Sequence, residues 1–97
     1  GDHNTGIGYY ALQSLTTGTN NVSVGSVTLD ANSTGSANVA LGYAALGANT
    51  TASYNTAIGY AALYDNTTGA NNTAVGRDAL SNNIQLRMIT LLLVLVH

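Results

Sequence analysis

The fold of this 97-residue chain is decided by the stretch Asn55-Thr56-Ala57-Ile58-Gly59-Tyr60-Ala61-Ala62-Leu63, because its pattern recurs every 17 residues. Three columns of the repeat hold one residue type throughout: Asn4, Asn21, Asn38, Asn55 and Asn72; Gly8, Gly25, Gly42, Gly59 and Gly76; Leu12, Leu29, Leu46, Leu63 and Leu80. A fourth column is wholly branched aliphatic: Ile7, Val24, Leu41, Ile58 and Val75. A fixed period of this kind indicates stacked copies of one structural unit.

A short β-strand is predicted just before each glycine of the repeat. Thr56 and Ile58 are two residues apart with a small residue between them, which is the side-chain spacing of a strand. Gly59 then supplies the backbone freedom of a tight corner. The segment that follows forms another side of the coil, with Leu63 pointing inward.

A single 17-residue unit cannot enclose a core, but stacked units can. Coils about 4.8 Å apart bury the aliphatic and leucine columns and pair each strand with its neighbours. We therefore predict an all-β protein, a parallel β-solenoid of about five turns that covers residues 1–83. Stacked asparagines can form hydrogen-bonded ladders, and we favour this structural role over ligand binding. A second corner is expected near Gly18, Gly35 and Gly69, where Ala52 in the same column shows that glycine is not required.

The repeat ends at residue 83, and residues 84–97 form an apolar C-terminal segment. Residues 84–88 alternate apolar and polar side chains, and residues 89–96 are apolar except for Thr90. This run is shorter than the roughly 20 residues that span a bilayer. Three interpretations remain open: a strand that caps the last coil or adds to another subunit, the start of a membrane segment, or sequence foreign to the native repeat protein. We favour the first, because strands covered on both faces are similarly rich in Leu, Val and Ile.

Three units carry a family resemblance: Asn38-Val39-Ala40-Leu41-Gly42, Asn55-Thr56-Ala57-Ile58-Gly59 and Asn72-Thr73-Ala74-Val75-Gly76. They resemble the head repeats of trimeric autotransporter adhesins of the YadA type, and similar repeats occur in bacteriophage tail-fibre shafts and other surface fibres. The resemblance covers residues 4–83, although this 17-residue unit is longer than the family's commonest repeat. It implies a left-handed β-roll, three chains packed side by side, and binding to host matrix or cell surfaces.

Charged residues are few, and they do not form a reactive constellation. Two Arg and four Asp give a net charge of −2, which excludes the basic surface that nucleic-acid binding requires. The chain has no Cys or Lys, its two His lie at opposite ends, and its four Asp occupy different repeat columns. A calcium-binding roll would place an acid in every turn, and a hydroxyl nucleophile would need a nearby base. We therefore expect no enzyme activity, no cofactor and no metal site.

Tyrosines form an interrupted column. Tyr9, Tyr43 and Tyr60 share one repeat position, which is Ser26 in the second unit and Arg77 in the last. Such an aromatic stripe can pack between chains or present a flat surface to sugar rings, and we favour packing.

Glycosylation sequons recur near the second corner. Asn32, Asn49 and Asn66 occupy one column and are candidate N-glycosylation sites. Glycans on them are predicted to form an outward row. Asn71 is a further candidate.

The leading functional hypothesis is a structural, non-catalytic subunit or segment of an extracellular or virion fibre. We expect it to assemble with itself as a homotrimer or an end-to-end filament, because a solenoid exposes open strand edges at its ends. The alternative is a carbohydrate- or matrix-binding adhesin head that uses the Tyr and Asn/Thr faces at a cell or virion surface. A third hypothesis is an ice-binding solenoid, although paired threonines such as Thr50 and Thr51 are adjacent rather than separated by one residue.

Overall fold

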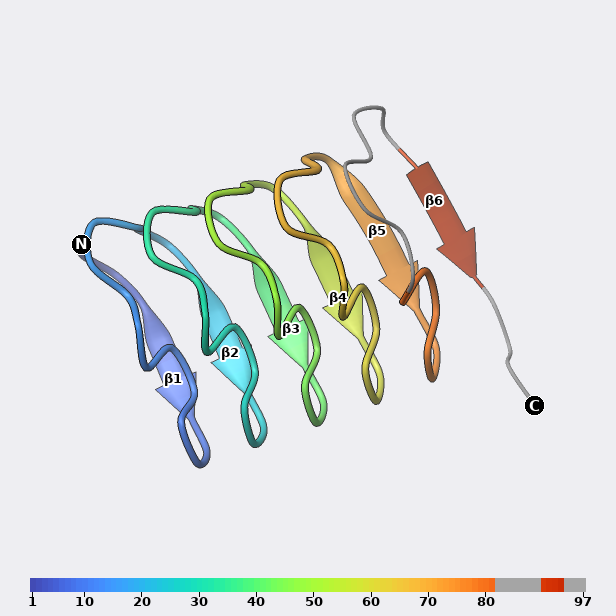
Figure 1. Ribbon diagram of the computed structural model, residues 1–97, viewed down its shortest axis with the longest axis horizontal. Helices are drawn as coiled ribbons and strands as arrows, with labels where there is room; N and C mark the ends of the chain where they lie inside the picture. Colours follow the sequence, from blue (N-terminus) through green and yellow to red (C-terminus); the bar gives the residue numbers. More distant parts are fainter. Residues whose placement is uncertain (82–89, 94–97) are drawn as a thin grey trace.

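The computed structural model describes residues 1–81 and 90–93, which form one parallel sheet of six short strands (Figure 1). The strands follow the chain order: β1 Thr5–Ile7, β2 Val22–Val24, β3 Val39–Leu41, β4 Thr56–Ile58, β5 Asn72–Val75 and β6 Thr90–Leu93. Between successive strands the chain turns back through bends and turns, and residues 1–81 contain no helix. The predicted all-β parallel solenoid is confirmed.

The register of the sheet follows the sequence period. Ile7 pairs with Val24, Val24 with Leu41 and Leu41 with Ile58, so residues 17 apart are neighbours along the axis. Backbone hydrogen bonds continue this pairing outside the strands, as where the Leu46 amide donates to the Ala62 carbonyl at 3.0 Å. Each coil therefore satisfies the backbone of the next.

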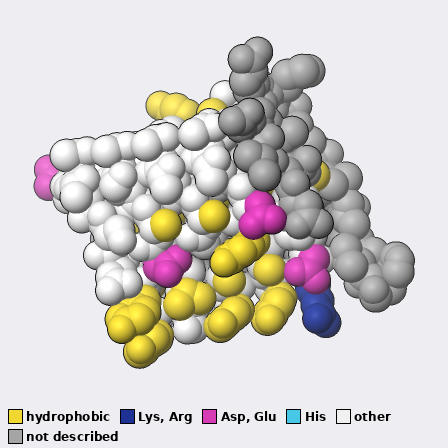
Figure 2. All heavy atoms as spheres, in the orientation of Figure 1, with side chains coloured by type: hydrophobic (Ala, Val, Ile, Leu, Met, Phe, Trp, Pro, Cys, Tyr) yellow, Lys and Arg dark blue, Asp and Glu magenta, His cyan; other side chains and the backbone are white. Residues whose placement is uncertain are grey.

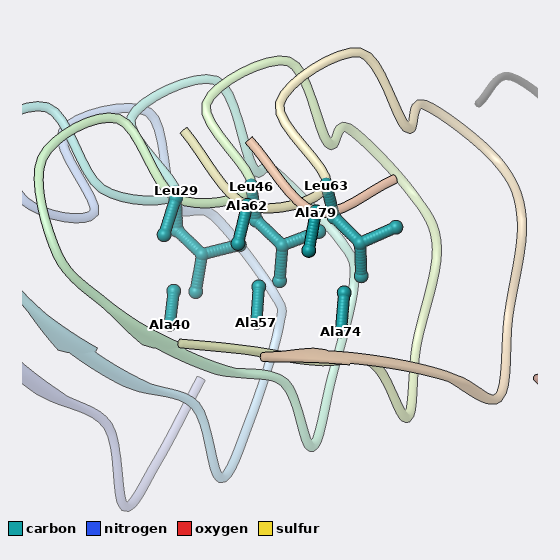
Figure 3. Close-up of a cluster of buried hydrophobic side chains, with 9 residues drawn as sticks. Leu29, Ala40, Leu46, Ala57, Ala62, Leu63, Ala74 and Ala79 are labelled. Atoms are coloured by element: carbon teal, nitrogen blue, oxygen red, sulfur yellow. The ribbon is translucent and has the colours of Figure 1, made fainter. Parts of the chain in front are cut away.

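The core is a row of leucines that faces a row of alanines (Figure 3). Leu29, Leu46 and Leu63 have no exposed surface, as predicted for that column. Opposite them, strands β3, β4 and β5 contribute Ala40, Ala57 and Ala74, which are also fully buried. A second alanine column, Ala45, Ala62 and Ala79, is buried in the same cluster, so one Leu and two Ala fill the interior of a coil.

The prediction that the aliphatic column is buried is wrong. Side chains alternate along a strand, so the small residue and its two neighbours point to opposite faces. A β-carbon built on Gly6 would lie 3.2 Å from Leu12 Cδ1, which shows that the leucine fills the space across the coil. The interior therefore takes the small residue, and the aliphatics face outward: Ile7 is 59 % exposed and Ile58 36 %.

Glycines of the repeat make the corner after each strand, as predicted. Gly42 has φ 117°, and a β-carbon there would lie 2.8 Å from the carbonyl of Gly59 in the next coil. The position thus demands glycine for its backbone conformation and for the close approach of the neighbouring coil.

The C-terminal strand β6 extends the sheet beyond β5. Asn72 pairs with Thr90 and Val75 with Leu93, in parallel orientation and at an offset of 18 residues rather than 17. The alternating pattern predicted over residues 84–88 lies outside the described residues, as does half of the apolar run 89–96.

Candidate functional site

The tyrosine column is split into two parts by Ser26. The rings of Tyr43 and Tyr60 stack with their centroids 5.2 Å apart and their planes 17° from parallel. Tyr9 instead contacts Tyr10, at 4.1 Å and 37°. The five Tyr of residues 9–60 are all about half exposed or more. Stacking along the axis follows from the repeat, since residues 17 apart are neighbours.

A hollow of about 380 Å³ lies beside the Tyr43–Tyr60 stack. It is lined by Val27, Asp30, Tyr43, Ala44, Tyr60, Ala61 and Tyr64. The repeat creates the shape of the hollow. Small side chains occupy the column of Ala44 and Ala61, while the column three positions further on holds Asp30, Gly47 and Tyr64 in successive coils. A β-carbon on Gly47 would lie 2.8 Å from the Tyr64 ring, so the absence of a side chain there gives the ring its place.

Acidic side chains lie next to hydrophobic ones on this face (Figure 2). Asp30 lines the hollow, and burial raises the pKa of its carboxyl above the ordinary value, although hydrogen bonds from its own amide and that of Ala31 partly oppose the rise. Arg77 lies at the end of the tyrosine stack, with its guanidinium carbon 5.2 Å from the centroid of the Tyr60 ring. Its Nε is 3.4 Å from Oδ2 of Asp78, an exposed pair that contributes little to stability.

A second surface is the outward side of the sheet, which we call the aliphatic face. It comprises the outward side chains of β1–β5: Thr5 and Ile7, Val22 and Val24, Val39 and Leu41, Thr56 and Ile58, Thr73 and Val75. All ten are exposed or half-buried, and none is charged. Because one aliphatic side chain comes from every coil, they form a continuous column.

The first asparagine column closes each coil. The Oδ1 of Asn38 accepts a hydrogen bond from the Asn55 amide at 2.9 Å, and its Nδ2 donates to the Ala52 carbonyl at 2.8 Å. The same pair of bonds recurs at Asn21 and Asn55, and all three side chains are fully buried. These bonds are structural, and most run between side chain and backbone rather than between side chains.

The prediction that glycans on one asparagine column would form an outward row is wrong, because that column is buried. Asn32, Asn49 and Asn66 have no exposed surface. The Nδ2 of Asn49, the atom that would carry a glycan, donates to Asn32 Oδ1 at 2.9 Å and to the Ala52 carbonyl at 3.1 Å. These residues form the side-chain ladder inside the second corner. Asn71 is exposed and stays a prediction.

One buried polar pair was not predicted. In the second coil, Ser23 and Thr28 replace the alanines of later coils, and their hydroxyls bond each other inside the core. Ser23 also donates to the Thr28 carbonyl at 3.0 Å. The signal was present in the sequence, because Ser23 aligns with Ala40, and Thr28 aligns with Ala45.

The described residues contain neither a metal-binding cluster nor a membrane-spanning helix. Among residues 1–81 and 90–93, no three His, Cys, Asp or Glu side chains lie together as they would around a metal ion. That part of the chain also contains no helix of the length and apolar character needed to cross a bilayer.

Comparisons with models of protein families, with curated proteins and with solved structures found no match.

Proposed function

We propose that this chain is a structural, non-catalytic segment of an extracellular or virion fibre that assembles with other copies of itself. The observation that carries the proposal is the aliphatic face. A contiguous, uncharged apolar column is unusual on a monomeric protein surface and is typical of an interaction surface. The face also extends over all five coils rather than one.

A second copy of the chain is the partner that this face fits best. Its side chains are repeated at the spacing of stacked strands, about 4.8 Å. Another solenoid of the same repeat presents ridges and grooves at the same spacing, so the two columns interdigitate along their whole length. A partner of different architecture would match only one or two coils. The absence of charge among these ten residues removes the repulsion that identical faces otherwise meet.

Burial of the aliphatic column would stabilise such an assembly. Each Å² of apolar surface removed from water contributes about 25 cal/mol. Because one aliphatic side chain comes from every coil, the contribution grows with the number of repeats. A trimer in which the three faces meet would bury every copy of the column. The resemblance to trimeric adhesin heads supports this arrangement and an extracellular location.

The test is the size of the purified full chain in solution. We expect sedimentation velocity to show a trimer or a larger assembly. Leu41→Lys places a charge at the centre of the aliphatic face and is expected to yield monomer, because an unpaired charge would be buried in the interface. Thr34→Lys, on an exposed residue at the second corner, is the matched control and should leave the assembly unchanged.

Circular dichroism of both variants separates loss of assembly from loss of fold. A monomeric wild type, or an assembly that Leu41→Lys does not weaken although the variant folds, would contradict the proposal.

A further inference from the structure

The stack of Tyr43 and Tyr60 has two ends, and only one is covered by a cation. At the C-terminal end, the Arg77 guanidinium lies over the Tyr60 ring, 5.2 Å from its centroid, and pairs with the Asp78 carboxylate. A positive group there is held between the electron-rich face of a ring and a negative charge. Cation–π attraction and ion pairing both favour this position.

At the N-terminal end the same position holds Ser26. A serine side chain is too short to cover a phenol ring, and Tyr43 is 51 % exposed. The hollow beside the stack is lined by Tyr43, Tyr60 and Asp30, so it combines aromatic rings with a carboxylate, as the surroundings of Arg77 do. None of the residues that line the hollow is basic.

We propose that this hollow binds a small organic cation of the alkylammonium class, such as a trimethylammonium group. The ligand lies against the side chains of Tyr43 and Tyr60, with Asp30 as its counter-ion. A volume of about 380 Å³ falls in the range of small-molecule sites. Burial raises the pKa of Asp30 because water is partly excluded from its carboxylate, and a bound cation would compensate that loss of hydration.

A sugar fits the hollow less well. Sugars need open ring faces and several hydrogen-bonding groups, but Tyr60 already stacks on Tyr43 and carries Arg77. Val27, Ala44 and Ala61 also line the hollow, and they offer no polar side chain. A neutral apolar ligand would leave the Asp30 carboxylate without a partner. The charge and the apolar lining together select a cation with an apolar surface.

The experiment is a titration of the full chain with choline, followed by NMR or calorimetry. Its neutral isostere, 3,3-dimethyl-1-butanol, has the same shape without the charge. We expect a dissociation constant in the millimolar range for choline and binding about tenfold weaker or worse for the neutral alcohol. Equal binding of the two compounds would show an apolar hollow only and overturn the proposal. Binding of methyl glycosides in place of choline would overturn it in favour of a carbohydrate site.

Tyr43→Ser is the sharpest variant, because it removes one ring from the lining of the hollow and introduces the residue that the second coil holds in that column. It should reduce choline affinity about tenfold or more, and Asp30→Asn should do the same. Matched controls are Tyr54→Asn, in a column that holds Asn20 and Asn71, and Asp65→Asn, outside the lining of the hollow. Both should bind choline as the wild type does.

Should Tyr43→Ser fail to fold by circular dichroism, Tyr64→Gly serves instead, since Gly47 occupies that column in the third coil. Unchanged affinity in a folded Tyr43→Ser or Tyr64→Gly variant would place the ligand elsewhere and overturn the proposal. The same choline group can come from a free small molecule or from a lipid head group, and co-sedimentation with phosphatidylcholine vesicles distinguishes these sources. A protein that binds choline but not the vesicles takes a free ligand, and a protein that binds choline and the vesicles takes a lipid. The inference is independent of fibre assembly, because the Leu41→Lys variant that tests assembly leaves the hollow intact.

Discussion

Five residues at one position of the repeat have φ values between 57° and 64°: His3, Asn20, Ala37, Tyr54 and Asn71. This left-handed backbone brings the side chain close to the carbonyl for every residue except glycine. Asparagine adopts it more readily than other residues, since its short amide bonds the local backbone. Asn already occupies this position in two of the five coils, whereas the third coil has Ala37 there.

Ala37→Asn is therefore expected to stabilise the protein. The gain should be about 1 kcal/mol, because the variant relieves part of the left-handed strain that alanine bears. Chemical denaturation followed by circular dichroism measures it. Ala48→Asn is the control: Ala48 is also half-buried but does not have a positive φ, so no gain is expected there.

The buried hydroxyl pair of Ser23 and Thr28 gives a second prediction at this scale. Ser23→Ala or Thr28→Ala alone should cost about 1–2 kcal/mol, since each leaves the other hydroxyl with fewer partners in the core. The double variant should be nearly as stable as the wild type, because later coils pack alanine at both positions. A double-mutant cycle of unfolding free energies checks this, and additive losses would contradict the expected coupling.

At the scale of one coil, the asparagine of the first column holds strand and corner together. Its side chain accepts a hydrogen bond from a backbone amide of the next coil and donates one to a backbone carbonyl of the second corner. One asparagine therefore satisfies two backbone groups. Asn55, for example, accepts from the Asn72 amide at 3.0 Å and donates to the Gly69 carbonyl at 2.8 Å.

Asn55→Ala is expected to lower the unfolding free energy by about 2 kcal/mol, because it leaves the buried Asn72 amide without an acceptor, while the Gly69 carbonyl keeps its hydrogen bond from Asn66 Nδ2. Asn4→Ala is the matched comparison and should cost less, since Asn4 belongs to the first coil and is only half-buried. Thermal and urea denaturation measure both. Equal losses would mean that burial does not set the cost.

The corner after the strand gives another prediction for a single coil. Gly42→Ala should cost about 3 kcal/mol or prevent folding, since its β-carbon meets the Gly59 backbone and φ is 117°. Gly47→Ala is the control: Gly47 has no positive φ, and its β-carbon would lie 2.8 Å from the Tyr64 ring, which can move outward, and 3.1 Å from the Ala44 carbonyl. We expect Gly47→Ala to change stability by less than about 1 kcal/mol, as measured by the urea midpoint.

At the scale of the whole molecule, stability is a sum over stacked coils. Deletion of residues 39–55 removes one whole repeat and joins Asn38 to Thr56, which leaves every column in register. We expect a folded and cooperative, although less stable, solenoid by thermal denaturation. Deletion of residues 39–56 removes one residue more and moves Ile58 into the position of a buried alanine. That variant should lose its cooperative transition, and equal behaviour of the two deletions would contradict the register argument.

The two surfaces proposed as functional differ in how far sequence could predict them. The tyrosine column and its interruption were evident from the period. The hollow beside it was not, because it depends on Asp30, Gly47 and Tyr64 in three successive coils and on the space that their different sizes leave. No local pattern contains that information.

The sequence by itself determined the 17-residue coil, the parallel stacking, the glycine corner and the inward leucine, since each follows from a residue type repeated at a fixed spacing. Only the tertiary structure decided which face of each strand is the inside. Alternation predicts that Ala57 and Ile58 point in opposite directions, but it leaves open which of them is buried. The leucine across the coil settles it, because the remaining space admits an alanine and excludes an isoleucine. The aliphatic residues therefore lie on the surface, where they become the proposed contact between chains.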